Sequence, residues 1–383
     1  MIRGHLQRPV GALLVAAAAA LSASAQSDAT YPAVVERYAR GERAFAVAGL
    51  ARFSHDDLIH EYGELRASLL AAERCPAATE EGRAKCSAAL ERRRALVRAA
   101  VMLHADKDGE DRPPTAGSEQ PRRCPGSQAA LAGRYAALLA RGAGSWDFAR
   151  RFFLGMVLRC QWDFCLEHAQ RWAHDGLKLF PKDAALLLAL ASVLEESATL
   201  AEIKTAEGLA GLPQRRRDEV QRSVAARTQR FQEARSYFEQ ALAADPSLAL
   251  ARVRLGRVLW RLGQNDAARA TLEQAVSQEP AGDVLYLARL FLGRVHEDLG
   301  HLLEAAAEYR LALALDPQAQ AAAVALSHVV RSIGEVEDSR ELLSRALSHA
   351  RRRQARDAFW EYLTRNALHY EALFDALRQE TLQ

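Results

Sequence analysis

Residues 253–280 read VRLGRVLWRLGQNDAARATLEQAVSQEP, and residues 290–317 read LFLGRVHEDLGHLLEAAAEYRLALALDP. The two stretches share one spacing: a Leu-Gly pair, a second Gly seven residues after the first, two Ala and a closing Pro. These positions are Leu255, Gly256, Gly263, Ala268, Ala275 and Pro280 in the first stretch, and Leu292, Gly293, Gly300, Ala305, Ala312 and Pro317 in the second. Self-similarity of this kind is typical of repeat proteins.

The shared spacing has a physical reason. Small residues let two antiparallel helices approach closely, and a Gly at the turn permits a sharp link between them. The Pro disfavours helix in the residue before it and so ends the second helix. Because one such unit cannot bury its own apolar faces, we expect neighbouring units to stack into a solenoid.

A third stretch, residues 324–346, keeps Leu326, Gly334 and Ala346 at the corresponding positions. Together the three stretches closely resemble the tetratricopeptide repeat, a helix–turn–helix unit of 34 residues. The distance from Pro246 to Pro280 is also 34 residues. The resemblance implies an all-α solenoid of antiparallel helix pairs that binds protein partners in a concave groove.

Composition agrees with a helical protein. Most of the apolar residues are Ala and Leu, which favour helix, whereas strand-forming residues are scarce. The 51 basic and 48 acidic residues give a net charge of +3. This balance is too even to indicate a nucleic-acid-binding protein.

The chain divides by pattern into five parts. Residues 1–25 are expected to be a cleaved signal peptide, since two Arg precede an apolar run too short to span a membrane, followed by Ala23-Ser24-Ala25. Cleavage near Ala25 and Gln26 would place the mature protein in the periplasm or outside the cell. The other parts are a helical block (26–105), a linker rich in charge, Pro and Gly (106–127), the solenoid (128–353, clearest at 230–350 and degenerate at 146–181) and C-terminal capping helices (354–383).

Five cysteines follow the signal segment, where an oxidising compartment permits disulfides. Cys75 and Cys86 flank a loop between two helical patterns and are the first candidate pair. Cys160 and Cys165 are the second. The alternative is that several of the cysteines form no disulfide and are simply small apolar residues with free thiols. None of the spacings matches a zinc site.

The concave groove is the most informative candidate site. If the repeat register is right, its inward positions form a mildly basic surface with one exposed Trp, suited to a peptide that carries acidic and apolar groups. The alternative is that its arginines are ordinary solvated side chains. The predicted groove residues are Val253, Arg257, Trp260, Arg261, Leu290, Arg294, Glu297, Val324, His328 and Arg331.

Candidates for chemistry are few. His55 and His60 lie five residues apart, so they do not share a helix face as two zinc ligands would. The better interpretation is that Ser54 caps a helix whose first turn is acidic. We therefore expect no enzymatic activity, no cofactor and no metal.

The predicted function is that of an exported scaffold or adaptor with a protein or peptide partner, without nucleic acid and without stable membrane insertion. One alternative is a helical protein of the cell envelope that binds a small molecule or a glycan. The other is a metal-dependent hydrolase centred on His55, Asp57 and His60.

Overall fold

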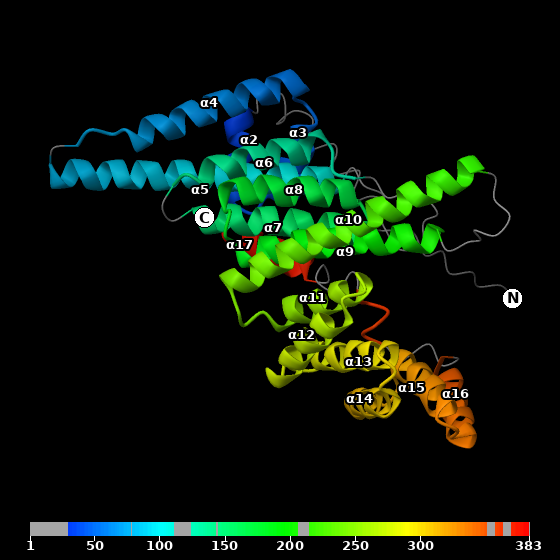
Figure 1. Ribbon diagram of the computed structural model, residues 1–383. Helices are drawn as coiled ribbons and strands as arrows, with labels where there is room; N and C mark the ends of the chain where they lie inside the picture. Colours follow the sequence, from blue (N-terminus) through cyan, green and yellow to red (C-terminus); the bar gives the residue numbers. More distant parts are fainter. Residues whose placement is uncertain are drawn as a thin grey trace, which may run out of the picture. The chain divides into compact units, whose positions relative to one another are not determined.

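The computed structural model describes residues 30–77, 79–110, 124–142, 145–205, 214–350, 357–362 and 369–382, and in these ranges the regular structure is entirely α-helical (Figure 1). The predicted signal peptide lies outside them. The chain forms two compact units: residues 1–151 together with 374–383, and residues 152–373. In the described residues, no helix is long and apolar enough to cross a membrane.

In its described residues the first unit takes five whole helices, the first residues of α7 (Trp146–Trp162) and the end of α17 (Tyr370–Gln379). The whole helices are α2 (Tyr31–Ala39), α3 (Arg43–Leu50), α4 (His55–Glu73), α5 (Glu80–Glu110) and α6 (Ser127–Leu139). Its core includes Tyr31, whose hydroxyl donates to the hydroxyl of Tyr135 and lies 2.9 Å from Nε2 of His104. Burial lowers the pKa of His104 to about 4, so its imidazole is neutral in this core.

Helix α5 runs further than the sequence indicates. Asp106 and Asp108, assigned above to the linker 106–127, are helical and buried, and Ser127 already begins α6. The carboxylate of Asp106 accepts hydrogen bonds from Tyr38 and from Arg378 near the C-terminus, and Arg43 lies 2.7 Å from it. The two aspartates are therefore part of α5, because their carboxylates have partners inside the fold.

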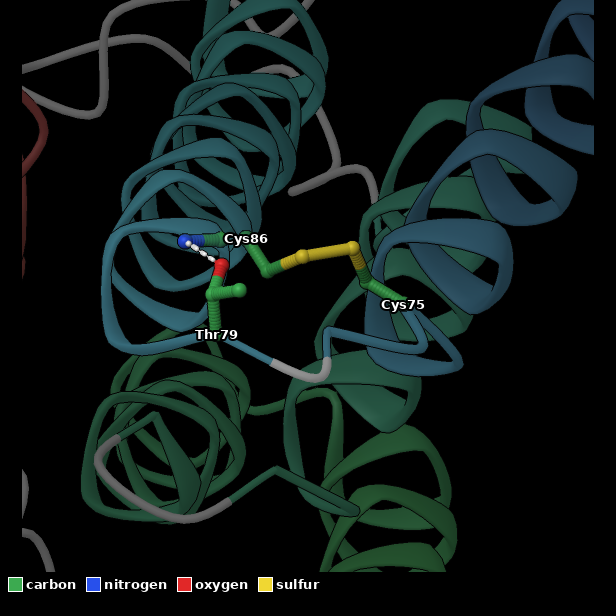
Figure 2. Close-up of a disulfide and its surroundings, with 4 residues drawn as sticks. Cys75, Thr79 and Cys86 are labelled. Atoms are coloured by element: carbon green, nitrogen blue, oxygen red, sulfur yellow. Dashed lines mark hydrogen bonds between the residues drawn. A yellow bond between two sulfur atoms is a disulfide. The ribbon is translucent and has the colours of Figure 1, made fainter.

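A disulfide joins the end of α4 to α5. Cys75 and Cys86 are bonded, as predicted, with their Cα atoms 6.0 Å apart (Figure 2). The loop between them turns at Thr79, whose hydroxyl accepts a hydrogen bond from the backbone N–H of Gly82 at 3.1 Å. Cys160 is buried and keeps its thiol, so the alternative pair Cys160–Cys165 is wrong.

The second unit consists mainly of antiparallel helix pairs (Figure 1). It takes the rest of α7 with α8 (Leu166–Leu179), then α9 (Ala184–Thr205) with α10 (Gln214–Ala244), α11 (Ala249–Arg261) with α12 (Asn265–Ser277), α13 (Asp283–Asp298) with α14 (Leu302–Leu315), and α15 (Gln320–Ser332) with α16 (Val336–Ala350). Most of α6 was expected in the solenoid, yet α6 packs on α5 and belongs to the first unit.

The repeat signature has the structural role that its spacing predicts. A Cβ at Gly256 would come within 2.5 Å of Leu272 Cγ, and a Cβ at Gly293 would collide with the ring of Tyr309, so both pairs need Gly where their helices cross. Gly263 and Gly300, at the turns, have φ of 74° and 79°, the left-handed region that favours glycine. The signature alanines Ala268, Ala275, Ala305 and Ala312 are fully buried.

The C-terminal segment differs from the expected capping helices. Residues 357–362 form turns rather than helix, and they contact the first helices of several repeats. Helix α17 (Tyr370–Gln379) exists, but residues 374–383 belong to the first unit. In residues 357–362, the aromatic side chains of Phe359 and Tyr362 pack against Phe291.

Candidate binding groove

Three first helices of successive pairs, α11, α13 and α15, form a groove with a cavity of about 510 Å³. Residues 357–362 supply another side of this cavity. Six of the ten predicted groove residues line it: Arg257, Trp260, Arg261, Leu290, Arg294 and Val324. These six side chains therefore share one cavity, and their part in binding stays a prediction.

The other four predicted residues do not line the cavity. Val253 is fully buried and packs in the core of the pair. Glu297 is half-buried and accepts hydrogen bonds from Arg294 at 3.3 Å and from the hydroxyl of Tyr309 at 2.8 Å. His328 lies 3.5 Å from Glu297, and Arg331 is exposed to solvent. These residues surround or support the groove.

Two tryptophans stand at the cavity in different settings. The indole N–H of Trp260 donates to Asp298 on α13 at 2.7 Å, and the guanidinium of Arg261 lies 5.3 Å from its ring centroid. Both contacts hold the Trp260 ring in one orientation. Trp360 packs edge-on against Phe359, yet 69% of its surface is exposed.

A buried ionic cluster lies beside the cavity and is centred on Glu195 of α9. Its carboxylate accepts hydrogen bonds from Arg254 at 2.9 Å, from Arg257 at 2.7 Å and from the Tyr362 hydroxyl at 2.6 Å. Arg254 and Glu195 are completely buried. Buried charges are tolerated when they are paired and hydrogen-bonded as these are. Burial also raises the pKa of Tyr362, so its hydroxyl stays protonated and donates.

The same cluster attaches the C-terminal segment to the repeats. Arg254 also donates to the backbone carbonyl of Tyr362 at 2.6 Å, and the Tyr362 ring packs against Phe291 with centroids 5.1 Å apart. At the other end of the segment, Asp357 accepts from the hydroxyl of Tyr286 at 3.0 Å and from the backbone N–H of Ala321 at 2.8 Å. The segment is therefore held at both ends.

Next to Glu195, the carboxyl of Glu196 is also buried. It accepts a hydrogen bond from the Gln161 side chain at 3.0 Å. Burial raises the pKa of Glu196 to about 7, and the charge of Glu195 adds to this effect, while Gln161 and Arg254 oppose it. Glu196 is therefore partly protonated near neutral pH.

The sequence analysis did not identify several residues that line the cavity or lie beside it. Arg254 lies three residues before Arg257 and seven before Arg261, so helical periodicity could have placed it on the same face. Nothing in the local pattern identifies Glu195, Phe291 or Trp360 as neighbours of these arginines. They meet through packing between segments distant in the chain.

The histidine-rich stretch has a structural role at the start of α4. The hydroxyl of Ser54 accepts a hydrogen bond from the backbone N–H of Asp57 at 3.2 Å, and the Asp57 carboxylate accepts from the backbone N–H of Ser54 at 2.8 Å. The Ser54 hydroxyl also donates to the Asp57 carboxylate at 2.7 Å, and this bond, followed by the one from the Ser54 backbone N–H, lowers the pKa of Asp57. The capping interpretation is confirmed. The described residues contain no group of three or more side chains able to hold a metal ion.

Residues 225–290 and residues 287–319 each match a family model of the tetratricopeptide repeat. The protein carries tetratricopeptide repeats. The matches run from the second half of α10 to the end of α14, so they include α11 and α13 of the groove and stop before α15. They agree with the resemblance seen in the repeat signature. The stacked pairs are thus an all-α tetratricopeptide-repeat solenoid.

Several solved structures are similar to this tetratricopeptide-repeat protein. MamA (residue 41 to the end) from Desulfovibrio magneticus RS-1 is 18% identical, with a TM-score of 0.41 over 54% of this chain and 97% of that one. PilF from Pseudomonas aeruginosa is 15% identical, with a TM-score of 0.43 over 60% and 89%. YrrB, described as a TPR protein with an unusual peptide-binding site, is 19% identical, with a TM-score of 0.37 over 58% and 91%. A search of curated proteins gives no match.

Proposed function

We propose that this tetratricopeptide-repeat protein is an exported adaptor that binds a protein partner in the groove of α11, α13 and α15. The observation that carries the proposal is the 510 Å³ cavity, which lies where the first helices of consecutive repeats meet. Apolar and cationic side chains line it together, as expected for a surface that takes a peptide segment. Stacked repeats of this kind generally use such extended surfaces for binding.

Export is supported by two features. The disulfide between Cys75 and Cys86 suits an oxidising compartment, because thiols in the cytosol are kept reduced. The pattern of residues 1–25 has the charge, apolar run and small residues of a cleaved signal peptide. We therefore assign the protein to the periplasm or the exterior of the cell.

A small-molecule or glycan ligand is the second candidate. It is favoured by the volume of the cavity and by its aromatic lining, since pockets of several hundred Å³ with a few polar groups are typical of such sites. A hydrolase centred on His55, Asp57 and His60 has no comparable support. Asp57 is engaged in the cap of α4.

The proposal is tested by cross-linking from inside the groove. A photoreactive amino acid replaces Val324, which lines the cavity and is 47% exposed. The matched control carries it at Leu303 of α14, which is 71% exposed and does not line the cavity. We expect discrete adducts with envelope proteins from the Val324 position and none of them from Leu303. Identical adducts from both positions, or none, would show that the groove does not bind a protein.

A charge-reversal variant sharpens this test. Arg257→Glu is unsuitable because it would place two carboxylates together in the buried cluster at Glu195. Arg294→Glu is preferable, since Arg294 lies on the cavity with 40% of its side chain exposed. We expect it to reduce the yield of the Val324 adducts while helical content stays unchanged.

A further inference from the structure

We infer that residues 357–362 form a fixed wall of the binding site. The pocket between the repeats and Trp360 then takes a peptide in which a carboxylate neighbours an aromatic or large aliphatic side chain. This inference rests on the proposed function and names the ligand class of the same groove. Trp360 becomes a specificity-determining residue that does not belong to any repeat.

The first step is that residues 357–362 are part of the folded structure rather than a displaceable ligand. Asp357 is 3% exposed and Tyr362 is 2% exposed. The guanidinium groups of Arg254 and Arg257 lie 4.5 and 5.0 Å from the centroid of the Tyr362 ring, in addition to the hydrogen bonds described above. Removing the segment would expose the buried cluster at Glu195 to water and would break its contacts with Tyr362. The binding energy of a ligand of moderate affinity cannot offset this loss of stability.

The second step is the exposure of Trp360. Phe359 and Tyr362 pack against Phe291 of α13, whereas 69% of Trp360 is exposed at the edge of the cavity. A large rigid aromatic side chain at the edge of a pocket provides contact area with little loss of conformational entropy on binding. The anchored segment fixes the backbone of Trp360, so the side chain is presented to whatever enters the pocket.

The third step is the charge of the lining. Arg257, Arg261 and Arg294 line the cavity, and the described residues of its lining include no acidic one. The carboxylates that pair with the first and last of these arginines, Glu195 and Glu297, are not among the lining residues. Guanidinium groups at a partly enclosed surface favour a carboxylate over a neutral group, because they can donate two parallel hydrogen bonds to it.

The fourth step is the apolar part. Trp260, Leu290, Phe291 and Val324 share the cavity with those arginines. The hydrogen bond from Trp260 to Asp298 keeps the indole ring in place before a ligand arrives. An apolar side chain and a carboxylate therefore find complementary surfaces within one pocket.

Within the chain itself, the repeats already bind a carboxylate and an aromatic side chain that lie close together in the sequence. Residues 357–360 read Asp-Ala-Phe-Trp, an acidic residue, an alanine and two aromatic residues. The groove satisfies the Asp357 carboxylate with one side-chain and one backbone donor, and it packs Phe359 against Phe291 with ring centroids 6.3 Å apart. An extended peptide from a partner would likewise place a carboxylate and an apolar side chain in the adjacent pocket, where guanidinium groups supply the donors.

The test measures binding of fluorescein-labelled peptides to the full-length mature protein by fluorescence anisotropy. The probe is a blocked hexapeptide with alternating Glu and Phe or Leu. One control peptide carries Gln in place of Glu, and another carries Gly in place of the apolar residues. We expect each control to bind about tenfold more weakly than the probe, since it lacks the charge-assisted hydrogen bonds or the apolar contacts.

Protein variants locate the binding. Trp360→Ala should weaken the probe about tenfold, and Trp360→Phe should retain most of the affinity. Trp146→Ala in the first unit, where Trp146 is 49% exposed, is the matched control and should change nothing. Thermal unfolding of Trp360→Ala should match that of the wild type, because the side chain is largely exposed.

Several results would overturn the inference. Equal binding to wild type and Trp360→Ala, or equal binding of the acidic and neutral peptides, contradicts it directly. If acetylated tryptophan binds at this pocket and the peptide does not, the site takes a small molecule. If no peptide binds but Val324 still cross-links to a partner, the ligand class is wrong and the adaptor function stands. Failure of both experiments contradicts both proposals.

Discussion

Arg254 and Tyr362, 108 residues apart in the chain, form a two-part contact in the second unit. The guanidinium of Arg254 donates to the carbonyl oxygen of Tyr362 at 2.6 Å, and it lies 4.5 Å from the centroid of the Tyr362 ring. The same guanidinium is paired with Glu195 at 2.9 Å. One arginine of a repeat helix thus holds both the backbone and the side chain of a segment beyond the last repeat.

Removing the hydroxyl of Tyr362 should destabilise the second unit. In Tyr362→Phe the ring contacts remain, but the Glu195 carboxylate loses one of its three donors in a buried site. We expect the free energy of unfolding to fall by about 1–3 kcal/mol, measured by urea denaturation. Tyr237→Phe is the control, since the half-buried Tyr237 ring packs on His174, and it should change stability by less than ~0.5 kcal/mol. Equal effects of the two changes would contradict a special role for the buried hydroxyl.

Adding one methyl group at the crossing of α13 and α14 should be costly. Gly293→Ala places a Cβ against the buried ring of Tyr309, which has no space to move away. We expect a loss of about 1–3 kcal/mol, seen as a lower midpoint of thermal unfolding. Gly63→Ala in α4 meets nothing within 4 Å, so it should instead raise helix stability by roughly 1 kcal/mol. A neutral Gly293→Ala variant would show that the helices tolerate a wider separation.

Loss of the disulfide should affect the tip of the α4–α5 hairpin. The bond between Cys75 and Cys86 spans 11 positions, and closing a loop of this size in the unfolded chain contributes about 3 kcal/mol in the chain-entropy model. In a Cys75→Ser, Cys86→Ser double variant, backbone amides near this loop should exchange hydrogen faster, while α11 to α15 stay protected. Unchanged exchange at the hairpin tip would mean that helix packing alone holds α4 against α5.

The pKa of Glu196 predicts a pH-dependent stability. Its folded-state pKa is about 7 and its ordinary value is 4.5, so between these values the folded protein binds more protons than the unfolded chain. Stability from this group is therefore complete below pH 4.5 and is lost as the pH rises to about 7. The total loss is on the order of 3 kcal/mol.

A neutral side chain removes this dependence. Glu196→Gln keeps a partner for Gln161 and should lack the decline in stability between pH 4.5 and 7, so the variant becomes more stable than wild type at pH 8. Urea denaturation at a series of pH values measures both curves. Parallel curves for the two proteins would show that Glu196 ionises normally in the fold.

Much of the solenoid could be predicted from the sequence because its signature is local. Gly256, Gly293 and the alanines that follow them report directly on how closely two adjacent helices approach. Groove positions such as Trp260 and Arg294 follow from helical periodicity once the repeat register is known. For the same reason, the cap at Ser54 and the pairing of Cys75 with Cys86 could be predicted from residues close together in the sequence.

The remaining features depend on contacts between distant residues. In the sequence, Asp106 belongs to a charged stretch that resembles a linker. Only the fold shows that Tyr38 and Arg378 donate hydrogen bonds to its carboxylate. Residues 354–383 were expected to be capping helices, yet residues 357–362 form turns that bond to Arg254, Tyr286 and Glu195. No local pattern predicts such long-range pairing, and here it places Phe359 and Trp360 at the cavity.

The anchored segment also has a mechanical consequence. In a solenoid each unit touches only its neighbours, so the array can bend and stretch along its axis and can unfold one unit at a time. Contacts of Asp357 and Tyr362 reach α9, α11, α13 and α15, which belong to four successive helix pairs. These repeats are expected to flex together and to resist stretching, so the groove keeps one curvature instead of adapting elastically to each ligand.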